Sequence, residues 1–222
     1  MNIRILSFLC CVLLSSSIAA QRRTDGVGLV GFSLEKKWSR TFSTSLMHQT
    51  MIHQNYSQWW MSFLDVGVGI RLNQHWSTEL HARRIAFSLP NGSYQNRHLF
   101  YHTISYLESF RNWTFSFRHR GQQLIYENHF DDSFKGPFWY FREKGNVRYR
   151  FNYYWSAYVN GELFFPLNRP TRPTIDQLRY GLGLIRTFNQ NIRLEAYTQL
   201  QQPTQVSRTQ RWVTGVTLQY NW

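Results

Sequence analysis

The sequence has 222 residues, a length that suits one domain of moderate size or two small ones. Hydrophobic residues make up 42% and charged residues 17%, which excludes a disordered chain and a charged coil. Aromatic residues reach 18%, but the mean hydropathy of −0.46 excludes a bundle of membrane helices. The formal charge is +13 at neutral pH, so an anionic partner has to be considered.

The first predicted element is a secretory signal peptide over residues 1–20. Its apolar core, Ile5–Leu14, follows a positive charge, and Ala20 is a small residue of the kind that signal peptidase needs. A retained helical anchor is the less favoured alternative, because this core is shorter than the ~20 residues that span a bilayer. Cleavage after Ala20 removes both cysteines and leaves residues 21–222 as one domain with a charge of +12.

After this segment, apolar and polar side chains alternate with a period of two over successive stretches of roughly ten residues. The breaks between the stretches are alternately short and long, as in a transmembrane barrel with tight turns at one end and longer loops at the other. Residues 121–141 form the longest break. The pattern predicts eleven strands, which are Val27–Lys37, Thr41–His53, Ser57–Leu72, Trp76–Phe87, His98–Glu108, Trp113–Gln122, Arg142–Tyr154, Ala157–Phe165, Ile175–Phe188, Ile192–Gln201 and Trp212–Trp222.

Each predicted strand has one polar face and one apolar face, because successive side chains of a strand point in opposite directions. In a membrane barrel the polar face lines the lumen. Glu35, Asp65 and Glu79 fall on that face. So does a predicted lumenal charge network of Arg118, Arg120, Arg148, Arg150, Glu162, Arg179, Arg193 and Glu195.

Two roles are open for this network. The charges can pair across the lumen and plug a narrow barrel, because buried charges need partners. Alternatively, the arginines can line an anion-selective pore or binding site. The first role is favoured, because ten to twelve strands leave a narrow bore.

The position of the aromatic rings separates a membrane barrel from a soluble β-protein. Rings gather at the predicted strand ends, for example at Trp59-Trp60, Trp139-Tyr140 and Tyr153–Trp155. Trp and Tyr favour membrane interfaces, where one part of the ring is in an apolar layer and the other in water. We therefore expect an all-β fold, a closed antiparallel transmembrane β-barrel of 10–12 strands. A soluble periplasmic β-protein is the alternative.

Twelve strands are favoured over eleven, because single-chain bacterial barrels have even strand numbers. The twelfth strand would come from residues 21–31 or from a hairpin within residues 121–141.

The last strand carries a predicted partner signal. Trp222 and Tyr220 are spaced like the terminal aromatic pair that the outer-membrane assembly machinery reads, although Thr217 stands where a glycine is usual and Gly215 lies two residues earlier. We therefore expect this machinery to recognise the strand that ends at Trp222.

Lipid is the other expected partner. Anionic lipopolysaccharide or phospholipid headgroups would contact basic residues near the predicted loops. Nucleic-acid binding is not expected, because the basic residues alternate on one strand face of an exported chain. These exposed residues near the loops are Arg169, Arg172, Arg208 and Arg211.

The candidates for catalysis and metal binding are weak. An acyl hydrolase needs its His and Ser on one strand face, and the spacing of His102 and Ser105 puts them on opposite faces. His98 and His102 share a face, but no nearby carboxylate or cysteine completes a metal set. We therefore expect no enzyme activity, no catalytic residue, no cofactor and no metal. A barrel-embedded lipid acyl hydrolase is the enzymatic alternative.

Four strand segments resemble a known family, namely Phe117–Arg120, Arg148–Phe151, Gly161–Phe164 and Leu178–Gly183. On these motifs, nearly all of residues 21–222 resemble DUF2490, a family of predicted outer-membrane barrels in Gram-negative bacteria. The resemblance implies a barrel in the cell outer membrane and assigns no reaction. We expect an outer-membrane barrel that is structural or a narrow pore, with an anion-selective channel as the alternative.

Overall fold

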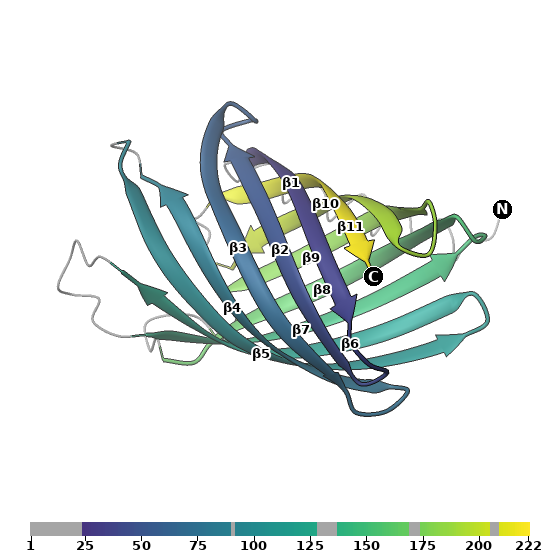
Figure 1. The fold of residues 1–222 in the computed structure, drawn as a ribbon. Coiled ribbons are helices and arrows are strands. Elements are labelled where there is room, and N and C mark those ends of the chain that lie inside the picture. The colour runs from purple at the N-terminus through teal and green to yellow at the C-terminus, as the bar shows by residue number, and fades with distance from the viewer. Residues whose placement is uncertain (1–23, 90–91, 128–136, 169–173, 205–208) are drawn as a thin grey trace, which may run out of the picture.

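The computed structural model describes residues 24–89, 92–127, 137–168, 174–204 and 209–222. Each strand pairs antiparallel with the next, and β1 pairs with β11 in parallel, which closes the sheet into a barrel (Figure 1). No helix in these ranges is long and apolar enough to cross a membrane. The strands are β1 (Thr24–Lys37), β2 (Phe42–His53), β3 (Gln58–Arg71), β4 (Trp76–Ser88), β5 (Tyr94–Phe110), β6 (Trp113–Tyr126), β7 (Phe138–Arg150), β8 (Trp155–Pro166), β9 (Gln177–Thr187), β10 (Ile192–Pro203) and β11 (Gln210–Asn221).

The barrel has eleven strands, so the prediction of twelve is wrong. Thr24–Lys37 is a single strand paired on both sides, and the strand residues described within 121–141 belong to β6 and β7, which pair with each other. The sheet closes with these eleven strands and leaves no free edge in its described part for a twelfth. In an odd-numbered sheet of alternating strands the first and last strands run in the same direction. The two accordingly pair in parallel from Thr24 opposite Gln210 to Glu35 opposite Asn221. The predicted antiparallel arrangement therefore fails at this one closing pair.

At several of the short turns, an asparagine side chain accepts hydrogen bonds from the backbone where one strand stops and the next begins. Oδ1 of Asn152 accepts hydrogen bonds from the backbone N–H groups of Tyr154 and Trp155, both at 2.9 Å. Asn73 and Asn189 make the same pair of contacts in their own turns. Because β7 ends before this turn, the predicted extension of that strand to Tyr154 is wrong, and Trp155 begins β8.

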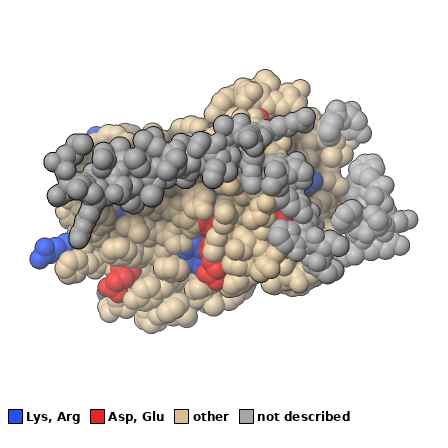
Figure 2. All heavy atoms as spheres, turned by 180° about the vertical axis from the view of Figure 1, so that it is seen from behind, with Lys and Arg blue, Asp and Glu red and all other residues tan. Residues whose placement is uncertain are grey.

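The barrel has a polar interior and an apolar exterior. Asp65, Thr103 and Glu162 point inward and are at most 3% exposed. Large apolar side chains on the opposite strand face remain 49–68% exposed, as at Val30, Leu64, Leu80, Phe117 and Leu182. On the side shown in Figure 2, charged atoms form only small clusters in a mostly uncharged surface. This distribution is the reverse of that in a soluble β-sandwich.

Outward-facing rings pack against one another near both ends of the barrel. Such pairs form across neighbouring strands and are stabilised by edge-to-face and tilted contacts. The ring centroids lie 5.0 Å apart in Trp76–Tyr106 and 4.7 Å apart in Trp113–Tyr149 at the short-turn end, and 5.3 Å apart in Trp59–Tyr94 at the other end.

The interior has two different walls. On the side of β1, β2 and β11, a cluster of Val27, Leu29, Met51 and Val213 is almost fully buried. The opposite side, formed by β6 to β9, carries most of the lumenal arginines. The fold therefore places an apolar wall opposite a cationic one.

Candidate functional site

Glu162 is the centre of the cationic wall. Its side chain, in the middle of β8, is 3% exposed. Oε1 accepts a hydrogen bond of 2.8 Å from Nη2 of Arg118 on β6 and another of 2.8 Å from Nη2 of Arg142 on β7. On β9, Nη1 of Arg179 lies 4.0 Å from Oε2. Charge-assisted bonds of this kind compensate for the desolvation of a buried carboxylate.

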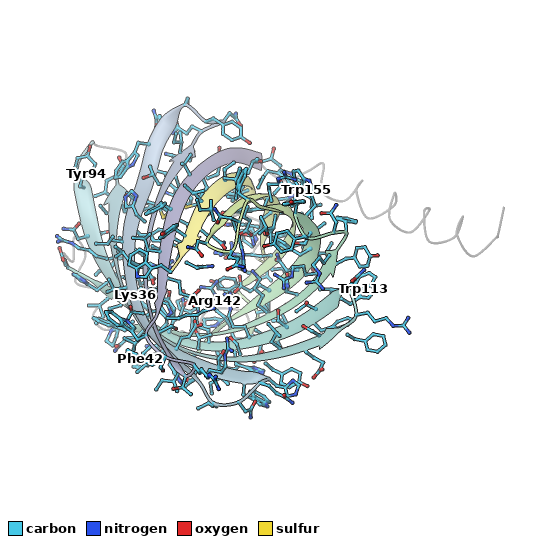
Figure 3. The ribbon with its side chains drawn as sticks, turned by 45° about the vertical axis from the view of Figure 1, so that its right-hand side comes forward. Lys36, Phe42, Tyr94, Trp113, Arg142 and Trp155 are labelled. Carbon is cyan, nitrogen blue, oxygen red and sulfur yellow. The ribbon has the colours of Figure 1, made fainter. Side chains whose placement is uncertain are left out.

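Aromatic stacking fixes two of these guanidinium groups. Arg142 and Arg179 each lie 4.2 Å from the ring centroid of Phe164, a favourable cation–π distance. Figure 3 shows Arg142 within the ring of strands, whereas Trp113 and Tyr94 lie at its outer edge. The guanidinium groups are therefore held in place in the lumen.

The other predicted network residues lie apart from Glu162. Arg120 donates from Nε to Oγ1 of Thr103 at 3.0 Å and lies 3.9 Å from the ring centroid of Tyr101. Glu195 accepts a hydrogen bond from the hydroxyl of Tyr158 and one of 3.0 Å from Nε2 of Gln219.

The remaining three arginines of the predicted network lie toward the short-turn end. Arg148 lines a cavity there, Arg150 is exposed at the end of β7, and Arg193 is half-buried near the start of β10. The eight predicted residues therefore form several separate groups along the wall.

A second buried carboxylate, Asp65 on β3, is 1% exposed. It accepts hydrogen bonds from Nε of Arg83 at 2.7 Å and from the hydroxyl of Tyr101 at 2.6 Å, and Nδ1 of His81 lies 2.6 Å from its Oδ1. The His81 ring stacks on Tyr101 with centroids 4.6 Å apart. It occupies the space above Gly67, where a Cβ atom would lie 2.3 Å from the imidazole.

A cavity of about 420 Å³ lies between the two walls of the lumen. Met47, Met51 and Trp60 lie on its less polar side. The described charged residues that line it are six cations and two carboxylates, namely Arg83, Arg118, Arg120, Arg142, Lys144, Arg179, Glu162 and Glu195.

A second cavity of about 290 Å³ continues from the first toward the short-turn end. The two share Arg118, Lys144, Tyr158 and Glu195 as lining residues, so they are adjacent. In the described residues, the partners of Asp65, Glu162 and Glu195 lie on strands at most two positions away. The charges thus pair along the wall, which differs from the expected pairing across the lumen, and they leave the space between the walls open.

The sequence pattern contained two site residues that the predicted network omitted. Arg142 and Lys144 alternate with Arg148 and so share its face. No sequence pattern indicated the contacts among Asp65, His81 and Tyr101. These contacts depend on the register of β3, β4 and β5, which the alternation of side chains does not specify.

The two candidate hydrolase residues lie on opposite strand faces. His102 faces outward, with Nε2 2.7 Å from Oγ1 of Thr78, and Ser105 lines the second cavity. His98, also outward, contacts the carboxylate of Glu127 beyond the end of β6. This hydrogen bond holds the pKa of Glu127 below its ordinary value. In the described ranges, no three His, Cys, Asp or Glu residues are grouped so that they could hold a metal ion.

Arg211 corrects one expectation about the loops. It lies next to a loop, at the second position of β11, but it is half-buried and its guanidinium group lies 4.7 Å from the ring centroid of Trp60, which lines the lumen. It is therefore not the exposed headgroup contact that was expected. The other three predicted lipid contacts, Arg169, Arg172 and Arg208, lie outside the described residues, as does the predicted signal peptide.

A protein-family model described as "Protein of unknown function (DUF2490)" matches residues 30–212, which run from β1 into β11. This chain belongs to the DUF2490 family. The resemblance seen in its strand motifs is therefore confirmed. No curated protein matches this DUF2490 chain in sequence.

One solved structure, titled "NanC porin structure in rhombohedral crystal form", is similar to this DUF2490 chain with a TM-score of 0.53. The match covers 83% of this chain and 90% of the other, at 14% sequence identity. At that identity the likeness concerns the fold alone, and it supports the closed β-barrel architecture.

Proposed function

We propose that this DUF2490 protein is an outer-membrane β-barrel whose lumen passes small anions. The observation that carries the proposal is the charge of the central cavity, where six cationic side chains and two carboxylates face the same space. Excess positive charge in a narrow, partly desolvated lumen attracts anions and repels cations.

The apolar exterior supports a membrane location. Side chains such as Leu64 on β3, Leu80 on β4 and Leu182 on β9 are about half exposed, and a soluble protein rarely exposes so large an apolar surface. In a bilayer the same surface contacts acyl chains, and the ring pairs at both ends lie near the headgroups. The similar NanC structure is called a porin in its title, which agrees with this proposal.

Export and assembly complete the proposal. Residues 1–20 direct the chain out of the cytoplasm, and the assembly machinery reads the last strand. The backbone N–H of Trp222 donates to the carbonyl of Glu35 at 3.0 Å, so the terminal residue pairs with the wall. Lipid and lipopolysaccharide surround the folded barrel.

Fractionation tests the location. The wild-type protein should be recovered with outer membranes, and its folded form should migrate differently from the boiled form on a gel. Recovery in the soluble periplasmic fraction, with the same mobility before and after boiling, would contradict the membrane proposal.

A lumenal charge substitution tests the pore. Lys144 lines both adjacent cavities. Lys144→Gln should lower the anion-to-cation permeability ratio about thirtyfold, because a unit charge 4 Å from an ion in water contributes about 1 kcal/mol, favourable for the anion and unfavourable for the cation. The ratio is measured from reversal potentials in planar bilayers.

Arg84→Gln is the matched control for this substitution. Arg84 lies on the outward face of β4 and is exposed, so the same loss of charge should leave the ratio unchanged. Equal effects of the two substitutions would show that the lumenal charge does not set the selectivity.

A further inference from the structure

The outer wall of the barrel carries an ion pair in the middle of two strands. His119 on β6 lies opposite Glu143 on β7, and both side chains face outward because their neighbours Arg120 and Arg142 face the lumen. Nδ1 of His119 lies 2.6 Å from a carboxylate oxygen of Glu143, and the side chains are 42% and 23% exposed. Among the described strands, Glu143 is the only outward carboxylate that is not close to a strand end.

This position is costly for charged groups if the barrel spans a membrane, so the inference rests on the proposed function. Along β7, Glu143 lies between the outward rings of Trp139 and Tyr149, near the two ends of the strand. Charged side chains on the lipid-facing surface of a barrel are most destabilising at the middle of the bilayer. A protein neighbour that supplies the opposite charges would remove this cost.

Three glycines lie near this pair on the outer wall. Gly121, Gly145 and Gly161 face outward on β6, β7 and β8, and Gly145 and Gly161 are directly paired. A Cβ atom added at Gly121 or Gly161 would meet no atom within 4 Å, and one at Gly145 would meet only Phe117, at 3.8 Å. Small residues let two walls approach closely in a membrane.

The other side of the barrel lacks an outward carboxylate in the middle of its described strands. The outward side chains in the middle of β9, β11 and β1 are apolar and exposed, as at Leu182, Val216 and Val30. Outward polar side chains also occur on β2 to β5, as at His48, Arg84 and His102. Among the described strands, an outward carboxylate away from the strand ends is combined with open glycines on the β6–β8 face, which comprises His119, Glu143 and the three glycines.

We propose that the β6–β8 face binds a second copy of this chain about a two-fold axis parallel to the barrel axis. Rotation about such an axis keeps each residue at its own height and brings β6 of one copy opposite β7 of the other. His119 of each copy then meets Glu143 of the second copy, so imidazoles and carboxylates alternate around the axis. The face is thus complementary to itself, as a two-fold interface requires.

Cysteine cross-linking in native outer membranes tests this arrangement. The only cysteines of the chain, Cys10 and Cys11, lie in the predicted signal peptide, and the unsubstituted chain controls for them. Gly145→Cys should give a cross-linked dimer with a short bifunctional maleimide. Val216→Cys, equally outward but on β11, should stay monomeric.

A charge swap tests the role of the ion pair. Glu143→Lys removes the carboxylate that accepts from the imidazoles of both copies, puts a buried cation in its place, and should abolish the Gly145→Cys dimer. The double change His119→Glu with Glu143→Lys restores alternating charges and should restore the dimer. The boiling-dependent gel shift of each variant shows that it is folded.

The outcomes separate this inference from the proposed function. If Gly145→Cys is folded in the outer membrane but stays monomeric, or if both cysteines cross-link equally, the interface is wrong while the barrel proposal stands. Another protein cross-linked at Gly145→Cys in place of a second copy would also overturn it. Recovery of the wild-type chain as a soluble protein overturns the proposed function and this interface together.

Discussion

Replacing Glu162 with glutamine is expected to destabilise the barrel by about 3 kcal/mol, a value typical of breaking a buried ion pair by removing one partner. The carboxylate is the shared acceptor of Arg118 and Arg142 and lies 4.0 Å from Arg179. Without its negative charge, these guanidinium groups repel one another at short range. Urea unfolding in detergent, followed by tryptophan fluorescence, measures the loss of unfolding free energy.

Glu195→Gln is the control for this first result. Glu195 also faces the lumen, but its hydrogen bonds come from Tyr158 and Gln219, which are uncharged. Its substitution should cost clearly less than that of Glu162. Equal losses in the two variants would mean that the cluster of arginines around Glu162 does not explain the stability.

The second large effect is expected at Asp65. Asp65→Ala removes the acceptor of Arg83 and Tyr101 and the carboxylate next to His81, all within 2.7 Å. Loss of a buried charge partner of this kind costs about 3–5 kcal/mol. His81 cannot relax freely, because its ring is stacked on Tyr101 and packed over Gly67. The temperature at which the folded gel band disappears should therefore fall strongly.

Tyr101→Phe provides a graded comparison. It removes one hydrogen bond to the same carboxylate and keeps the ring that stacks on His81, so its cost should be about 1.5–3 kcal/mol. A loss for Tyr101→Phe as large as that for Asp65→Ala would assign the stability to the tyrosine hydroxyl and contradict the role given to the carboxylate.

The strands were predictable because the alternation of side chains is a local signal. Phe117 and Arg118 lie on opposite faces, and one such pair is enough to orient a strand once one face is apolar. Asn152 also indicated a turn, because asparagine favours turns of this kind. The aromatic residues Tyr153 and Tyr154 after it, however, led to the prediction that the strand continues. Strand ends were therefore predicted less well than strand faces.

The closure of the barrel and the grouping of its charges were not predictable in this way. The pairing of Val27 with Val213 joins the two ends of the sequence, and no local pattern specifies a contact of that range. The choice of Glu162 as the common partner of Arg118 and Arg142 likewise depends on the register of three strands. The alternation of side chains predicts which charged residues face the lumen. It does not predict which of them form ion pairs with one another.

The central claim is that the lumen of this DUF2490 barrel conducts anions, and the wild-type reversal potential tests it most directly. Purified protein in a planar bilayer under a tenfold KCl gradient should give a steady current that reverses near the equilibrium potential of chloride. The excess of cationic side chains in the central cavity predicts this sign. A reversal near the equilibrium potential of potassium, or the absence of a steady current, would contradict the account.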